Sequence, residues 1–210
     1  MPILEYLQFA IGRLLYPIRA HDSRQLIYWP AFQHLPEPNM TLESDCGPSG
    51  SSLPLRCSMI AKDRSGALPE LHWSAPESTE PVKEYMLVCE DIDIPIPFMV
   101  IHHGLFWAIP APVTAAMPED VQPHEDADQT HRTKAGWRFL PNIMSKPYIG
   151  AGAPLGHGSH RYVFTIIALN TALEMDAPEK VTKQEIKQAM EGKIIGWGQW
   201  TGVFERPWPT

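Results

Sequence analysis

Apolar and polar positions near the N-terminus alternate with the period of a helix. Apolar residues from Leu4 to Ile18 recur at spacings of three and four, which places them on one face of a helix predicted over residues 2–19. A secretory signal would need a basic leading segment, but Glu5 comes first. We expect residues 1–20 to dock onto the rest of the chain as an amphipathic helix. Self-association, a mitochondrial address and contact with a membrane surface are the alternatives.

Further along the chain, apolar runs predict strands. Residues 85–89 form a continuous apolar run, as a strand buried on both faces would, and the acidic sequence 90–93 follows at its carboxyl end. Frequent prolines between residues 30 and 66 predict short strands joined by turns. Other strands are predicted over residues 68–73, 100–109, 162–169 and 200–204.

One more helix and one long loop complete the pattern. Thr182 and Glu185 have the spacing of a capping box, and Gly192 supplies a stop, which predicts a short helix between them. Residues 111–135 show neither the helical nor the alternating pattern of apolar residues, and their prolines and acidic residues predict a long loop. A solvated acidic insertion is the simpler interpretation of this loop, and a lid or partner contact is the functional one. We expect a single domain over residues 21–210.

Composition indicates a folded protein that is rich in strands and turns. Hydrophobic residues make up 44% of the 210 residues and charged residues 20%, which is enough apolar material for a core. Twenty-two prolines argue against a helical bundle, because each proline lacks a backbone donor and restricts φ. No stretch reaches the ~18 consecutive apolar residues that cross a bilayer. We therefore expect no membrane span.

Charge and cysteine content narrow the partners and the compartment. A net charge of -7 leaves no broad cationic face to neutralise a phosphate backbone, so nucleic acid is not an expected partner. Cys46, Cys57 and Cys89 are an odd number without zinc-type spacing, and we expect small buried apolar groups rather than disulfides. A reducing, cytoplasmic location follows from this interpretation.

Short acidic positions and histidines form the candidate site. Asp91 and Asp93 precede His103, and His160 follows a glycine-rich segment much further on. Two carboxylates spaced by one residue can point the same way in an extended chain and orient imidazoles through hydrogen bonds. Exposed turn acids with unrelated histidines are the alternative. A metal site is not expected, because the adjacent residues His102 and His103 would face opposite sides of a strand.

Two motifs make the chain resemble the phosphatidylethanolamine-binding protein (PEBP) family. Residues 90–95, Glu-Asp-Ile-Asp-Ile-Pro, resemble that family's Asp-Pro-Asp-Ala-Pro segment. Residues 150–162, which end in Gly-Ser-His-Arg-Tyr, are similar to its Gly-x-x-Pro-Pro-x-Gly-x-x-x-His-Arg-Tyr signature. His102 and His103 match the family's histidine strand, and the N-terminal helix is similar to that of fungal members. The resemblance covers about residues 24–206 and implies an antiparallel β-sandwich with peripheral helices.

The resemblance also implies a small anion-binding pocket near one end of the sheets. Imidazole, backbone amide and tyrosine hydroxyl groups can donate to phosphate or carboxylate oxygens, whereas carboxylates repel an anion and are expected to hold the donors in place. The guanidinium of Arg161 could clamp an anion, but Arg161 alternates away from its strand neighbours His160 and Tyr162, which favours a structural ion pair. His157 is a further candidate donor, expected in an exposed loop. The residues that would line or support the pocket are Asp91, Asp93, His103, Gly152, Pro154, His160 and Tyr162.

Departures from the family pattern suggest the kind of ligand. Ile92, Ile94 and Ala153 stand where the family has proline, alanine and proline, and they make the rim of the pocket more aliphatic. We therefore expect a small phosphate- or carboxylate-bearing ligand with an apolar body. Under the first hypothesis, the protein only binds this ligand, without a cofactor. A regulated kinase or protease and a second copy of the chain are the further partners considered.

A second hypothesis is catalytic. PEBP-like proteins accompany fungal maleidride pathways, in which alkyl maleic anhydrides are dimerised, so the resemblance makes this chain a candidate enzyme or accessory factor that assists a pathway enzyme. His103 or His160 would then act as acid or base in a lyase- or cyclase-like formation of a carbon–carbon bond. A hydrolase is less favoured, because the sequence has no Gly-x-Ser-x-Gly elbow.

Overall fold

The apolar run at residues 85–89 forms the centre of the larger of two antiparallel sheets. The computed structural model describes residues 3–62, 66–175, 177–206 and 208, so the expected helix start at residue 2 lies outside the described residues. The strands of this five-stranded sheet, in spatial order, are β6 (Arg138–Phe139), β4 (Ile101–Pro110), β3 (Glu84–Asp91), β7 (His160–Leu169) and β8 (Ile194–Phe204).

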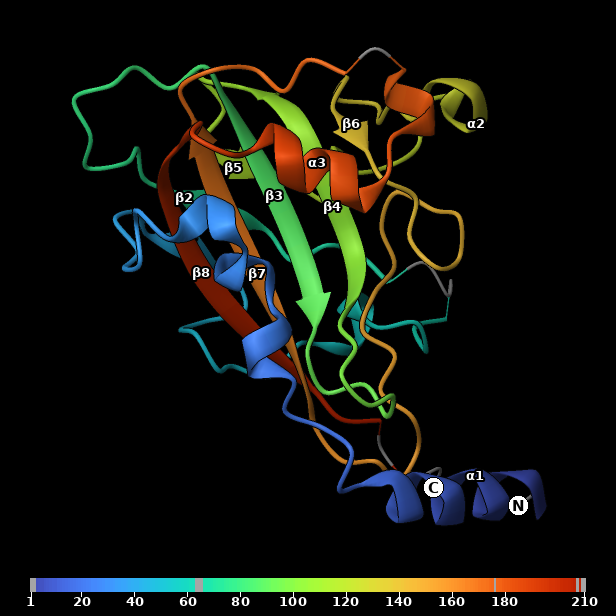
Figure 1. Ribbon diagram of the computed structural model, residues 1–210. Helices are drawn as coiled ribbons and strands as arrows, with labels where there is room; N and C mark the ends of the chain where they lie inside the picture. The colour runs from blue at the N-terminus through green and yellow to red at the C-terminus, as the bar shows by residue number, and fades with distance from the viewer. Residues whose placement is uncertain (1–2, 63–65, 176, 207, 209–210) are drawn as a thin grey trace.

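A small sheet covers one face of the larger one. Alternate β3 residues Tyr85, Leu87 and Cys89 enter a core with Leu71 and Trp73 of the small sheet. The small sheet consists of β1 (Leu42–Ser44), β2 (Leu71–Trp73) and β5 (Ala115–Ala116). The two layers form the expected mainly β architecture, an antiparallel sandwich with peripheral helices (Figure 1).

Helical segments cover the opposite face of the larger sheet. Met86 and Val88 of β3 join a second core with Ile186 of α3 (Lys183–Ala189) and with Leu26. The predicted capping box is present, with Thr182 as the N-cap of α3. Both faces of β3 are therefore buried, as its unbroken apolar sequence predicts. The remaining single-turn helices are η1 (Asp22–Arg24), η2 (Leu26–Tyr28), η3 (Pro30–Phe32), η4 (Leu55–Cys57) and η5 (Pro178–Lys180).

Two proline-rich segments differ from expectation. Residues 30–66 were expected to hold several short strands, but among those that the structure describes only β1 is a named strand, since prolines lack the donor that a ladder needs. Residues 111–135, expected to form one long loop, contain β5 and the short helix α2 (Ala127–Thr130). Ala116 and Ala127 of these two elements are buried, so this segment is more than a solvated insertion.

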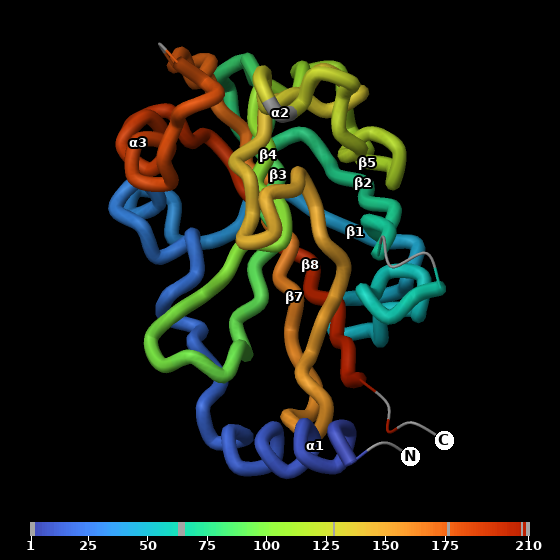
Figure 2. Tube along the Cα trace, turned by 90° about the vertical axis from the view of Figure 1, so that its right-hand side faces the viewer, coloured from blue at the N-terminus to red at the C-terminus, as the bar shows by residue number. Residues whose placement is uncertain are grey.

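The N-terminal helix α1 (Ile3–Leu15) lies at one end of the sandwich, beside the glycine-rich loop before β7 (Figures 1 and 2). It ends before residue 19, because Pro17 disfavours helical backbone in the residue ahead of it. Gly12 is its only buried described residue, and a Cβ there would overlap the carbonyl oxygen of Leu155. The helix docks on the domain, but its apolar stripe, which includes Leu14, is largely exposed.

No helix among the described residues is long and apolar enough to cross a membrane.

Candidate functional site

The ends of three neighbouring strands bring the candidate residues together. Asp91 at the end of β3 pairs with Tyr162 near the start of β7, and His160 begins that strand. Glu90 of β3 pairs with His102 of β4 and not with His103, so His103 is the extra residue of a β-bulge. A bulge re-aims a side chain, and here it brings His103 Nε2 to 4.0 Å from Asp91 Oδ2.

Asp91 orients His160. The imidazole Nδ1 of His160 lies 2.8 and 3.1 Å from the two carboxylate oxygens of Asp91, and both side chains are buried. A carboxylate accepts hydrogen bonds, so Nδ1 of His160 carries a proton. Asp91 also accepts from the backbone N–H of Asp93 at 2.9 Å, which holds the carboxylate in place. This is the supporting role that the sequence predicts for Asp91.

His103 presents a base to the same cluster. Its Nδ1 lies 3.0 and 3.1 Å from the carbonyl oxygens of Ile149 and Gly150, so Nδ1 carries the proton. Its Nε2 is buried and has no hydrogen-bond partner among the described residues. Burial lowers the pKa of His103 because it disfavours the charged ring, although Asp91 opposes the shift. The neutral ring therefore keeps a lone pair on Nε2.

Tyr162 connects the cluster to the glycine-rich loop. The backbone N–H of Gly152 donates to the Tyr162 hydroxyl at 3.0 Å. Burial raises the pKa of Tyr162 well above its ordinary value, and the charge of Asp91 raises it further, so the phenol stays protonated. The hydroxyl accepts from Gly152, and its own hydrogen donates to the carboxylate of Asp91.

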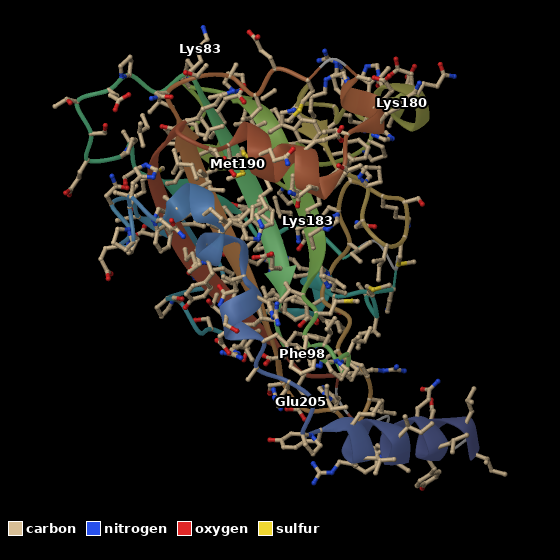
Figure 3. The ribbon with its side chains drawn as sticks, viewed as in Figure 1. Lys83, Phe98, Lys180, Lys183, Met190 and Glu205 are labelled. Carbon is tan, nitrogen blue, oxygen red and sulfur yellow. The ribbon has the colours of Figure 1, made fainter. Side chains whose placement is uncertain are left out.

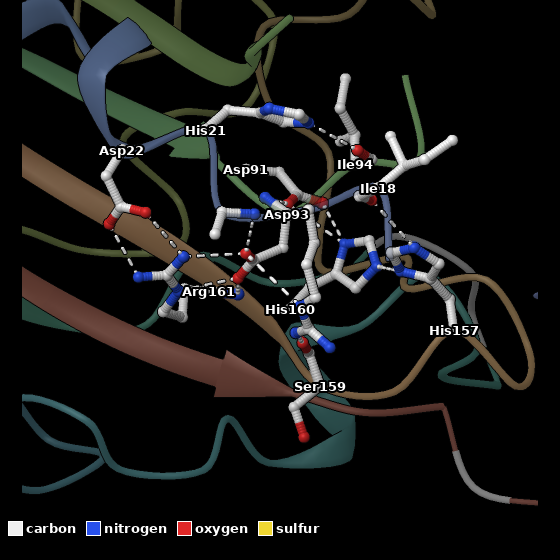
Figure 4. Close-up of polar contacts among 12 residues, drawn as sticks. Ile18, His21, Asp22, Asp91, Asp93, Ile94, His157, Ser159, His160 and Arg161 are labelled. Atoms are coloured by element: carbon white, nitrogen blue, oxygen red, sulfur yellow. Dashed lines mark hydrogen bonds and ion pairs between the residues drawn. The ribbon is translucent and has the colours of Figure 1, made fainter. Parts of the chain in front are cut away.

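Asp93 lies behind the cluster in an ion-pair network (Figure 4). Arg161 donates to Asp93 from its backbone N–H and, at 2.8 Å, from its guanidinium, which also pairs with Asp22. Burial by itself would raise the pKa of Asp93, but the hydrogen bonds from Arg161 and Ala20 outweigh it and lower the pKa to about 2. The expected structural ion pair of Arg161 is confirmed.

His157 is not in an exposed loop position, contrary to expectation. Its side chain is fully buried, because Gly156 and Gly158 adopt positive φ angles on either side and turn the loop inward. Nδ1 of His157 lies 2.7 Å from Nε2 of His160, so the second ring nitrogen of His160 is engaged. The sequence near His157 shows only the two glycines. Its partner on α1, the carbonyl group of Leu15, lies far away in the chain.

Two of the cavities beside the glycine-rich loop include predicted site residues in their linings. A groove of about 210 Å³ between α1 and the loop includes Pro154 in its lining, and a wider basin of about 810 Å³ includes Gly152. The buried side chains of Asp91, His103, His160 and Tyr162 line neither cavity; they lie behind the loop. Of the seven predicted residues, these four converge, Gly152 joins them through Tyr162, Asp93 joins them through its backbone N–H to Asp91, and Pro154 lies apart from them. The basin lining consists of Met59, Ile60, Ala61, Lys62, Met144, Lys146, Gly152, Ala153, Phe204 and Arg206.

The model of the phosphatidylethanolamine-binding protein family matches residues 43–205. The chain belongs to this family. A PEBP homologue from Chlamydia trachomatis has a TM-score of 0.61 and 20% identity, and covers 81% of this chain and 100% of its own. Escherichia coli YbcL has the same TM-score and 23% identity, with coverages of 80% and 99%. At these identities, the two structures support the fold alone.

Two fungal relatives match more of the chain. A protein of a fungal species, named phomoidride biosynthesis cluster protein B, is 35% identical over 208 residues, which is 98% of this chain and 97% of the relative. Its namesake from Talaromyces stipitatus is 37% identical over 212 residues, with coverages of 98% and 84%. Coverage of 98% includes most of α1, which lies outside the range of the family model.

Proposed function

We propose that this PEBP-family protein binds a small anion with an apolar body in the basin beside Gly152. The observation that carries the proposal is the lining of this basin, in which Lys62, Lys146 and Arg206 supply three cations and no carboxylate is found among the described lining residues. In a chain of net charge -7, such a local excess of cations favours an anion. Met59, Met144 and Phe204 supply apolar surface for the rest of the ligand.

The buried side chains of Asp91, His103, His160 and Tyr162 lie behind the loop that lines this basin. The Tyr162 hydroxyl lies between Gly152 and Asp91, so a ligand oxygen would compete with Asp91 for its hydrogen, and Nε2 of His103 has no hydrogen-bond partner among the described residues. A ligand oxygen that reached past Gly152 would meet a donor and a base within one small region. His160 is less suited to direct contact, because Asp91 and His157 occupy both of its ring nitrogens.

The names of the fungal relatives favour a more specific ligand. Two relatives that match nearly the whole chain are named for a phomoidride biosynthesis cluster. We extend the proposal to alkyl maleic anhydrides and their diacids, and to assistance with their dimerisation or cyclisation. His103 would remove a proton from carbon next to the anhydride, because its neutral ring offers a lone pair at neutral pH.

Binding is tested by calorimetric titration with an alkylmaleate diacid. Lys62→Ala and Lys146→Ala should each weaken binding about two- to fivefold, as removal of a solvent-exposed charge pair does. Lys83→Ala is the matched control, since Lys83 lies at the opposite end of the molecule from α1 and Glu205 (Figure 3). Maleate without the alkyl group should bind more weakly. Equal affinity of the three variants would contradict binding in the basin.

Catalysis is tested separately with a labelled alkyl maleic anhydride and analysis of the products. His103→Asn should abolish product formation, because its amide can replace Nδ1 as a donor to Ile149 and Gly150 but provides no base. An unchanged melting temperature of this variant would confirm that it folds. Saturable binding without any product from the wild-type protein would support a binding protein and contradict the enzyme.

A further inference from the structure

The C-terminal end of α1 is joined to the candidate site through a chain of three side chains. Nε2 of His157 lies 3.0 and 3.2 Å from the carbonyl oxygens of Leu15 and Ile18, at the end of α1 and just beyond it. Nδ1 of His157 lies 2.7 Å from Nε2 of His160, and Nδ1 of His160 bonds to Asp91. Figure 4 shows the contacts of His157 with Ile18 and His160 and the contact of His160 with Asp91.

The partners at the two ends determine where protons must lie. Carbonyl oxygens only accept, so Nε2 of His157 carries a hydrogen, and the same reasoning places one on the Nδ1 of His160 that faces Asp91. In two neutral rings, the facing nitrogens, Nδ1 of His157 and Nε2 of His160, would then both present lone pairs. Two acceptors at 2.7 Å repel each other, so one further proton must lie between them.

We infer that Asp91, His160 and His157 hold one proton more than an ionised carboxylate and two neutral imidazoles would, and that this proton couples the docking of α1 to pH. We call these three residues the Asp–His–His triad. Whether the extra proton belongs formally to a histidine or to Asp91, the triad has no net charge, and each of its hydrogen bonds has one donor and one acceptor. This inference concerns the ligand-free protein and does not rest on the proposed function.

The surroundings of the triad favour the extra proton. The end of α1 carries the negative pole of the helix dipole, and its last carbonyl groups have no partner within the helix. A cationic imidazole at His157 or His160 would therefore lie between that pole and the carboxylate of Asp91. Removing the proton would leave a buried net negative charge and two facing lone pairs, which is unfavourable in a site shielded from water.

Neighbouring charged and titratable groups limit the triad to one extra proton. Arg19, from the segment after α1, lies near His157, and Tyr16 packs against its ring. On the strand side, His103 and Tyr162 lie beside His160, and both are neutral groups. Burial lowers the pKa of His157, and the charge of His160 lowers it further, so a second extra proton is disfavoured.

Helix docking should therefore weaken at high pH. As the pH rises and the extra proton leaves, the bond between His157 and His160 is lost, and with it the position of the donor that holds Leu15 and Ile18. Because the proton is bound in the docked state, docking is stabilised below the pH at which the triad loses this proton and is weakened above it. At low pH, a second proton would place two N–H groups face to face and weaken docking again.

The test measures hydrogen exchange of the α1 amides in the full-length protein, corrected for intrinsic rates. In the wild type, the population with undocked α1 should rise about tenfold or more between pH 6.5 and pH 9. This is the change expected when one charge-assisted hydrogen bond is lost. His157→Ala should show undocked α1 at every pH. No change of α1 exchange with pH in the wild type would overturn the inference.

Two further variants separate the triad from simple loss of structure. His157→Gln can still donate to the helix carbonyl groups without an extra proton, so α1 should stay partly docked and lose its dependence on pH. His124→Gln is the matched control and should behave like the wild type, because the imidazole of His124 is hydrogen-bonded to the exposed side chain of Asp126, outside the triad. Retention of the wild-type pH dependence in His157→Gln would overturn the inference, provided that both variants melt cooperatively.

Imidazole NMR provides a direct proton count. At pH 6.5, long-range nitrogen–proton spectra should show hydrogens on Nε2 of His157 and Nδ1 of His160, and a proton between the facing nitrogens. Two neutral rings that each carry a hydrogen on one nitrogen, together with an ionised Asp91, would contradict the proposed count.

Discussion

Helices α1 and α3 attach to the same domain through different forces. α3 and its C-cap residue place Ile186 and Met190, both fully buried, against the larger sheet, and a capping box closes the N-terminus of the helix. α1 buries Gly12 alone among its described residues, and a histidine from a distant loop bonds to its C-terminal end. Tyr6 and Phe9 of α1 also make edge-on aromatic contacts with Trp208. Amphipathic periodicity therefore predicts that a helix forms, while its contacts decide whether apolar burial, or a few polar bonds and aromatic contacts, hold it.

The largest effect is expected for Ile186→Ala in α3. This substitution removes an apolar side chain that packs between α3 and the sheet and leaves a cavity, so the free energy of unfolding should fall by about 2–5 kcal/mol. Urea denaturation followed by circular dichroism measures the change. A loss below about 0.5 kcal/mol, the range of ordinary surface substitutions, would show that burial does not hold α3.

A smaller and pH-dependent effect is expected for Asp93→Asn, at the attachment of the segment that follows α1. Asp93 accepts from the N–H of Ala20 at 2.9 Å and from Arg161, and its pKa is lowered to about 2. Ionised Asp93 therefore stabilises the fold above an ordinary aspartate pKa of about 3.9, and this contribution is lost as the pH falls through about 2. The substitution should lower the free energy of unfolding by roughly 2–3 kcal/mol at pH 7.

Denaturation of both proteins at several pH values tests the sign of this effect. The difference between wild type and Asp93→Asn should be full at pH 5 and above and should shrink as the pH approaches 2. Asp126→Asn is the control, because Asp126 is an exposed carboxylate whose pKa is also lowered, by a hydrogen bond with His124. A difference between wild type and Asp93→Asn that stays constant with pH would mean that the charge of Asp93 contributes nothing.

Much of the fold follows from local sequence patterns. The apolar run at 85–89 predicts a strand with two buried faces, and both hydrophobic cores meet on β3. The capping box at Thr182 predicts the start of α3, because capping is a local interaction. The short elements β5 and α2 were missed, since Ala115–Ala116 is too short to show a period and takes its form from pairing with β2.

The site could be predicted only in part. The convergence of Asp91, His160 and Tyr162 follows from the family motifs, and the ion pair of Arg161 follows from alternation along a strand. The burial of His157 does not follow from either, because it depends on where α1 lies, and α1 precedes this loop by about 140 residues in the chain. Contacts across such a separation leave no periodic or local signal in a single sequence.

The smallest effect is expected for Leu14→Ala, the counterpart in α1 of Ile186→Ala. Leu14 is 77% exposed, and alanine favours helix at least as well as leucine, so the free energy of unfolding should change by no more than about 0.5 kcal/mol. Both substitutions shorten an apolar side chain on an amphipathic helix, so the difference between them isolates burial. A loss as large as that of Ile186→Ala would mean that Leu14 is covered in solution. An unfolding midpoint that also rises with protein concentration would then identify a second copy of the chain as the cover, because only association makes the midpoint depend on concentration.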